Sequence, residues 1–71
     1  MTIANNPYTI EMVQKYHDYS AILEDGLDLE DLSYCMDTLR IKAYQEGLNA
    51  PETMIMDNLI LAMNSIHRDR E

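Results

Sequence analysis

Aromatic bulk, disulfides and flexible loops are all scarce in this sequence. Phenylalanine and tryptophan are absent, and there are only two glycines, two prolines and one cysteine. A single cysteine excludes a disulfide within the chain, which suits a reducing compartment such as the cytoplasm. Two isolated glycines also exclude the glycine-rich loop that cradles phosphates in nucleotide-binding proteins. Leucine, isoleucine, methionine and five tyrosines must therefore supply the bulk of the core.

Positive charge is also scarce. Five Lys and Arg residues face thirteen Asp and Glu residues, so the net charge is −8. Binding to nucleic-acid phosphates depends on Lys and Arg, so we expect no direct contact with nucleic acid. A basic protein is the natural counterpart of such a surface.

Long apolar runs are missing as well. The longest apolar-rich stretch, residues 54–63, is interrupted by Asp57 and Asn58 and is too short and polar to span a bilayer. The initial residues, MTIANNPYT, carry neither positive charge nor an apolar run. We therefore expect no signal peptide, no membrane anchor and a cytoplasmic location.

The sequence does contain residues that typically start and end helices, with apolar residues between them that can form one small core. We predict a single all-α domain over residues 1–71, with helices at about 7–24, 29–46 and 50–67. Asn6-Pro7 and Asn49-Ala50-Pro51 are typical helix starts, and Gly26 and Gly47 are typical helix ends. The short connections favour a compact three-helix bundle. The alternative is a helical hairpin whose third helix pairs with a second copy to form a homodimer.

Helical periodicity predicts which side chains form the core. In the first helix these are Tyr8, Met12, Val13, Tyr16, Tyr19 and Leu23. In the second they are Leu29, Leu32, Met36, Leu39 and Ala43, with Cys35 at the edge of the stripe as a small buried hydrophobe. In the third they are Ile55, Leu59, Ala62 and Ile66, broadened by Met56, Ile60 and Met63. Met54 and Leu61 point elsewhere, which makes them the candidate interface of the alternative homodimer.

The stretch EDGLDLEDLSYC, residues 24–35, places five carboxylates in eight positions around one glycine. Asp28 fits the N-cap of the second helix, and Glu30 and Asp31 lie in its first turn, where negative charge is favoured. A calcium loop of the EF-hand type requires a bidentate Glu at its twelfth position. Counting from Asp25, that position is Met36, so we expect no calcium or other metal site here.

The remaining carboxylates suggest a surface for a partner. Residues 11–37 carry a net charge of −7, and the rest of the chain only −1. Asp18, Glu24 and Asp25 lie outside the first turn of the second helix, so no cap explains them, and Glu11, Asp18 and Asp25 are spaced to share one helix face. Neighbouring carboxylates on one face of a helix are about 5–6 Å apart, a spacing similar to that of a nucleic-acid backbone. The alternative is that this acidic face is merely solvated.

A second unusual feature lies opposite the leucine stripe of the second helix. Tyr34, Asp37, Ile41 and Tyr44 form an apolar and aromatic row there, which is a signal for a binding surface. The alternative is that the bundle wraps around both faces of this helix.

The sets of residues that make up catalytic and metal sites are incomplete in this sequence. His17 and His67 are far apart, and no second ligand stands near either at the spacing of a metal site. The neighbours of Cys35 are acidic, whereas a reactive thiol needs an electropositive setting. We therefore expect neither an enzyme nor a bound cofactor.

Together these features predict a non-enzymatic, acidic protein that engages a basic, nucleic-acid-handling protein. The predicted contact residues are Glu11, Asp18, Glu24, Asp25, Tyr34, Asp37, Ile41 and Tyr44. At the level of size and charge alone, the chain resembles small phage-encoded inhibitors that mimic DNA or block host defence nucleases. That resemblance implies a phage-type inhibitor of a host nuclease or defence complex. The alternative is a homodimeric structural or regulatory subunit joined through Met54 and Leu61.

Overall fold

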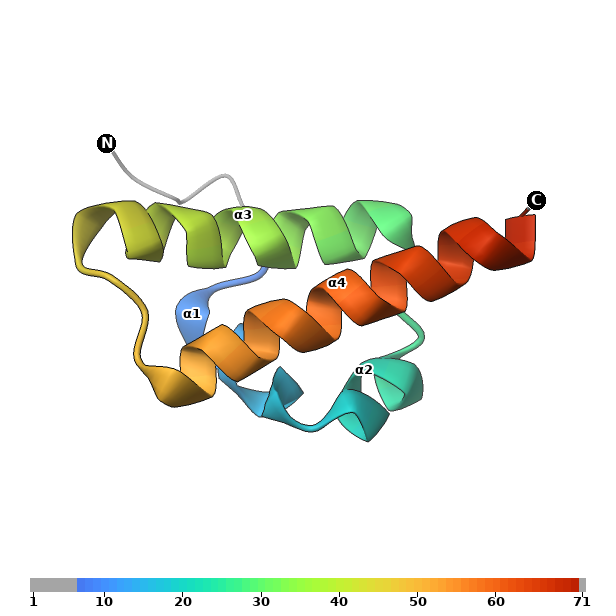
Figure 1. Ribbon diagram of the computed structural model, residues 1–71, viewed down its shortest axis with the longest axis horizontal. Coiled ribbons are helices and arrows are strands. Elements are labelled where there is room, and N and C mark those ends of the chain that lie inside the picture. The colour runs from blue at the N-terminus through green and yellow to red at the C-terminus, as the bar shows by residue number, and fades with distance from the viewer. Residues whose placement is uncertain (1–6, 71) are drawn as a thin grey trace.

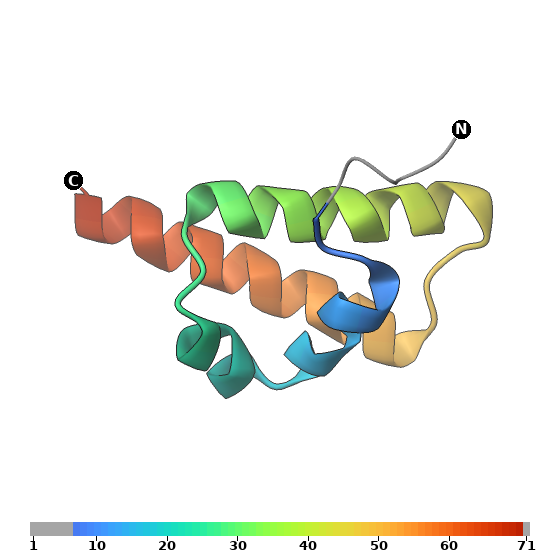
Figure 2. The same cartoon turned by 180° about the vertical axis from the view of Figure 1, so that it is seen from behind.

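The computed structural model describes residues 7–70, and helices are the only regular elements in that range. They are α1 (Ile10–Val13), the 3-10 helix η1 (Gln14–His17), α2 (Tyr19–Asp25), α3 (Leu29–Gln45) and α4 (Ala50–Arg70). The all-α prediction is confirmed. The helix α4 lies between α3 on one side and the short segments η1 and α2 on the other, while α1 reaches α3 (Figure 1). The view from behind shows α1, η1 and α2 winding across the face of this long pair (Figure 2).

The first predicted helix, residues 7–24, is wrong as a continuous element. Its predicted cap, Asn6, lies outside the described residues, and helical structure begins only at Ile10, where the Thr9 side chain accepts a hydrogen bond from Met12 N. The helix then stops at Asp18, whose backbone is extended with φ −111° and ψ 120°. Residues 11, 18 and 25 therefore do not share one helix face.

Two polar side chains stabilise this break. The Asp18 carboxylate accepts hydrogen bonds from Ser20 N at 3.0 Å and from Ser20 Oγ at 2.8 Å, so it caps α2. Asn58 on α4 donates from Nδ2 to the carbonyl oxygens of Tyr16 and His17, each at 3.1 Å. Carbonyls at a helix end need such partners because the helix itself no longer satisfies them.

The break also changes which side chains are buried. Val13 and Tyr16 lie in the core as predicted, and Tyr8 and Tyr19 are half-buried. Met12 is exposed and Leu23 is 62% exposed, so their assignment to the core is wrong. The interruption at Asp18 resets the helical register, and Ile22 is buried instead.

The helix α3 follows the prediction closely. Asp31 N donates to Asp28 Oδ1 at 2.9 Å, and Asp28 N reaches Asp31 Oδ2 at 3.5 Å, which completes a reciprocal capping box. Gly26 ends α2 with φ +64° and Gly47 follows α3 with φ +86°, a region that glycine enters without steric penalty. Leu32, Cys35, Thr38 and Leu39 are fully buried, Leu29 and Met36 are half-buried, and Ala43 is exposed, contrary to its assignment to the stripe.

The helix α4 begins as predicted and continues three residues beyond the predicted end at 67. Glu52 N donates to Asn49 Oδ1 at 2.9 Å, and Asn49 N donates to Glu52 Oε1 at 3.1 Å. Its buried apolar side chains are Ile55, Leu59 and Ala62, joined by the partly buried Met56, Met63 and Ile66. Ile60 is exposed, so the apolar face is narrower than predicted. Over residues 7–70, no helix has the length and hydropathy that crossing a bilayer requires.

Candidate interaction surface

Two carboxylates that the sequence left without a structural role have one. Asp18 caps α2, and its hydrogen bonds from Ser20 hold the pKa of its carboxyl below the ordinary value. Asp25 Oδ2 lies 2.7 Å from Lys15 Nζ and accepts a hydrogen bond of 2.6 Å from the Tyr16 hydroxyl. Lys15, followed by Tyr16, lowers the pKa of Asp25. The expectation that no cap explains these residues is therefore wrong for Asp18, whereas Asp25 caps no helix and is held by Lys15 and Tyr16 instead.

Tyr16 connects this surface to the core. Its side chain is buried, yet its hydroxyl reaches Asp25 at the end of α2. Burial, strengthened by the hydrogen bond to Asp25, raises the pKa of Tyr16 well above its usual value. The hydroxyl therefore stays protonated as a donor, and it ties η1 to the end of α2.

Five acidic residues lie in the last turn of α2, in the short turn that follows it and in the first turn of α3, which Figure 1 shows next to one another along the chain. We call this the acidic corner; its members are Glu24, Asp25, Asp28, Glu30 and Asp31. Within residues 7–70, Lys15–Asp25 is the one ion pair at this corner. Four of its five carboxylates thus have no cationic partner among the described residues.

Two other predicted contact residues lie apart from the acidic corner. Glu11 is exposed on α1, which lies away from the turn between α2 and α3 (Figure 2). Asp37 lies further along α3 and pairs with Arg40 at 3.2 Å. The structure therefore gathers only part of the predicted acidic set into one place.

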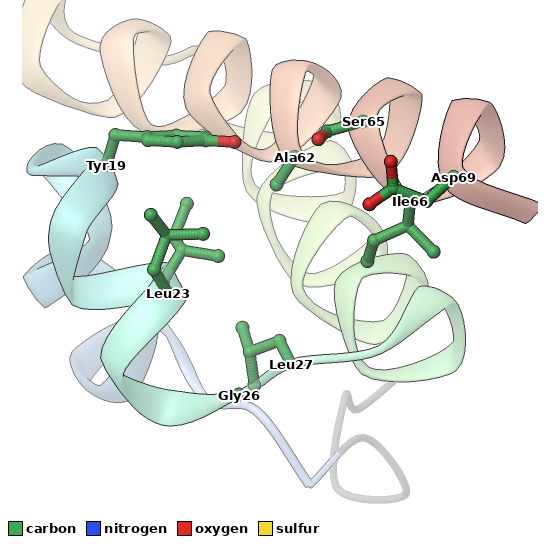
Figure 3. Close-up of a pocket in the computed structure, with 9 residues that line it drawn as sticks. Tyr19, Leu23, Gly26, Leu27, Ala62, Ser65, Ile66 and Asp69 are labelled. Atoms are coloured by element: carbon green, nitrogen blue, oxygen red, sulfur yellow. The ribbon is translucent and has the colours of Figure 1, made fainter.

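A groove with apolar and polar walls adjoins the acidic corner. It consists of two hollows between α2 and α4, of about 170 and 310 Å³, which share Tyr19 and Ser65. The smaller hollow is lined by Tyr19, Leu23, Leu27, Ala62, Ile66 and Asp69, among others, with the Tyr19 ring reaching from α2 towards α4 (Figure 3). The larger one is lined in part by Leu61 and Arg68. We call this the α2–α4 groove.

Sequence periodicity missed this groove because its walls come from two helices about forty residues apart. Periodicity predicts that Leu23 lies in the core, yet it is 62% exposed and lies on the groove wall. Periodicity predicts that Leu61 points away from the core, and it does, with 58% of its surface exposed. The one sequence signal for the groove was therefore the outward position of Leu61.

The row of Tyr34, Ile41 and Tyr44 on α3 is only partly available. The Tyr34 ring stacks on Tyr8, with centroids 6.5 Å apart and an interplanar angle of 25°. Burial, with a hydrogen bond from the hydroxyl to Asp31, raises the pKa of Tyr8 to about 12. Ile41 is half-buried, whereas Tyr44 is 95% exposed. The row thus offers one fully exposed aromatic ring rather than a continuous apolar strip.

The buried polar groups have structural partners. Glu52 is buried and bonds Lys42 Nζ at 3.0 Å, and the Asn49 amide, followed by Lys42, lowers its pKa. Cys35 is fully buried, and burial raises the pKa of its thiol to about 12. A thiol with so high a pKa is a poor nucleophile at neutral pH. Among the described residues, no group of three or more His, Cys, Asp or Glu side chains is placed to hold a metal ion.

No protein-family model, curated protein or solved structure matches this chain. Its function therefore has to be inferred from its own surfaces. Of these, the acidic corner and the α2–α4 groove lie next to each other, because Gly26 and Leu27 of the turn also line the smaller hollow.

Proposed function

We propose that this protein is a non-enzymatic, cytoplasmic binding protein that engages a basic, nucleic-acid-handling protein through its acidic corner. In that role it acts as a nucleic-acid mimic, in the manner of a phage-type inhibitor of a host nuclease or defence complex. The observation that carries the proposal is the concentration of five carboxylates at one corner with a single ion pair among the described residues.

Glu24 supports the proposal because folding does not require it. It lies in the last turn of α2, where the helix dipole makes negative charge unfavourable. The side chain is exposed, and no hydrogen bond or ion pair to it is present within residues 7–70. Like charges this close also repel one another. A cationic partner would relieve both costs.

Three of the other four members of the acidic corner are held in place by their structural roles. Asp28 and Asp31 form the capping box of α3, and Asp25 is fixed by Lys15 and Tyr16. Fixed side chains lose little rotational freedom on binding, which favours affinity. A rigid array of carboxylates is therefore a better imitation of a phosphate backbone than a mobile one.

The experiment that tests this proposal compares wild type with Glu24→Lys and uses Glu46→Lys as the matched control. Glu46 is also exposed and lies at the C-terminal end of α3, so it makes the same change in charge beside the negative end of a helix. Each protein is used to capture partners from bacterial lysate, and captured basic proteins are then tested for binding to duplex DNA. We expect Glu24→Lys alone to lose the captured protein, and DNA to compete with the wild type for it. Equal capture by all three proteins would contradict the proposal.

A second candidate function is the homodimeric structural or regulatory subunit. It is favoured by Met54 and Leu61, two exposed apolar side chains seven residues apart on α4, which are 54% and 58% exposed. If α4 pairs with a second copy, light scattering should give about twice the monomer mass of 8.3 kDa. Met54→Glu should then give a folded monomer. A wild type that stays monomeric at high concentration removes this candidate.

A further inference from the structure

We propose that the α2–α4 groove receives an apolar side chain from a basic, amphipathic helical segment of the partner. This inference rests on the proposed function and names the segment that the same end of the molecule recognises. The acidic corner would bind the cations of that segment, and the groove would bind the apolar residue between them.

The groove has the size and lining of a pocket for anchor side chains. Pockets for small-molecule ligands usually enclose about 300–1,000 Å³. The two hollows, of about 170 and 310 Å³, lie at or below the lower end of that range. Leu23 and Leu61 stand at the groove more than half exposed, so an apolar side chain placed there would bury them. Contacts of this kind, at the centre of a charged rim, dominate the energy of many interfaces.

Charge complementarity identifies the occupant as basic. Asp69 lines the smaller hollow, Glu24 follows Leu23 in α2, and Asp28 follows Leu27 in the turn. Lys and Arg residues beside the anchor would therefore meet the Asp69 carboxylate at this hollow and the acidic corner next to it. An amphipathic helix presents apolar and basic side chains in this arrangement when it lies in a groove.

The charged side chains that line the groove differ between its two hollows. Arg68 lines the larger hollow, whereas Asp69 and the turn residues Gly26 and Leu27 line the smaller one. The cations of the partner should therefore cluster over the turn between α2 and α3, and not over Arg68. A second copy of this chain fits poorly, because it would bring another net charge of −8 to the acidic end.

Fluorescence anisotropy with synthetic peptides tests this inference. The first probe is a labelled amphipathic helix of lysine and leucine, the second has glutamine in place of each leucine at the same charge, and the third has glutamate in place of each lysine. We expect the lysine–leucine probe to bind most tightly and the glutamate–leucine probe not to bind. Leu23→Gln and Leu61→Gln should each weaken the binding of the first probe about fivefold or more, the usual loss for an anchor contact.

Met54→Gln is the matched control, because Met54 is also more than half exposed on α4 but does not line either hollow. It should bind the first probe as the wild type does, and all three variants should keep the helical circular dichroism signal. If Leu23→Gln and Leu61→Gln bind like the wild type while Glu24→Lys binds less, the groove is not used and only the acidic corner stands. If neither cationic probe binds at low salt, both the groove and the proposed function are wrong.

Discussion

At the scale of single residues, the core depends on a few fully buried side chains. Leu32 and Leu39 on α3 have no exposed surface, and they pack with Ile55 and Leu59 of α4. Phenylalanine and tryptophan are absent, and Tyr16 is the one larger side chain that is fully buried with them among the described residues. A domain of this size has a total stability of only about 5 kcal/mol. Each buried leucine is therefore a large part of the whole.

Leu32→Ala and Leu39→Ala should each lower the free energy of unfolding by about 2–5 kcal/mol, because each leaves a cavity in the core. Both variants should be largely unfolded by circular dichroism. Leu23→Ala is the control, since Leu23 is mostly exposed and its truncation should change stability by less than about 0.5 kcal/mol. If the three variants melt alike, the assignment of the buried face of α3 fails.

The contacts of Asp25 predict how the stability of the protein depends on pH. Lys15 and then Tyr16 lower its pKa from the ordinary value of 3.8, so the charged form is favoured in the folded state. A depressed folded-state pKa stabilises the protein above the pKa of the unfolded chain and loses that effect as the pH falls through the folded value. Asp25→Asn should therefore be less stable than wild type at neutral pH, and the difference should shrink below about pH 4. Thermal unfolding at a series of pH values measures this, and a constant difference would show that the contact contributes nothing.

At the scale of elements, the sequence predicted those helix starts and ends that depend on neighbouring residues. The caps at Asp28 and Asn49 and the glycines at 26 and 47 act on residues within one turn of themselves, so their effects could be predicted. The break at Asp18 could not be predicted in full, because it depends on Asn58, about forty residues further along the chain, as well as on the local bonds from Ser20. The acidic corner was predictable as a charge cluster, but the structural role of Asp25 depends on the hydroxyl of the buried Tyr16. The α2–α4 groove likewise exists only once two distant helices meet.

Asn58→Ala tests the account of the break. It removes two hydrogen bonds to the carbonyls of Tyr16 and His17, and a typical hydrogen bond contributes about 0.5–1.5 kcal/mol. We expect a loss of about 1–3 kcal/mol in the free energy of unfolding. Asn64→Ala, on the exposed surface of the same helix, should change stability far less. Equal stabilities of the two variants would mean that Asn58 does not hold η1 in place.

At the scale of the whole molecule, the acidic corner and part of the exposed apolar surface lie next to each other. The turn between α2 and α3 belongs to the acidic corner and also lines the α2–α4 groove, and α4 contributes Asp69 to that groove (Figure 3). Residues 11–37 carry most of the net negative charge, and few Lys or Arg side chains in the described part of the chain form ion pairs with them. The fold therefore presents a charged and partly apolar end that it does not itself neutralise.

Glu24→Lys should weaken binding without lowering the stability of the fold. Removing negative charge from the last turn of α2 should raise the free energy of unfolding by about 0.3–1 kcal/mol, through the helix dipole and reduced repulsion. Glu46→Lys should be stabilised by a similar amount, because it makes the same change at the end of α3. Chemical denaturation measures both values. A clear loss of stability in Glu24→Lys would indicate a structural role for this side chain.

The central claim is tested most directly by the dependence of partner affinity on salt, measured for wild type, Glu24→Lys and Glu46→Lys with the same captured basic protein. Exposed charges attract less strongly as ionic strength rises, since the Debye length falls from about 30 Å at 0.01 M to about 8 Å at 0.15 M. The wild type and Glu46→Lys should therefore lose affinity steeply and equally between these salt concentrations. Glu24→Lys should bind more weakly at low salt, chiefly through a slower association rate, and should show a flatter dependence on salt. Three identical curves, or a wild-type affinity that does not change with salt, would contradict the proposed role of the acidic corner.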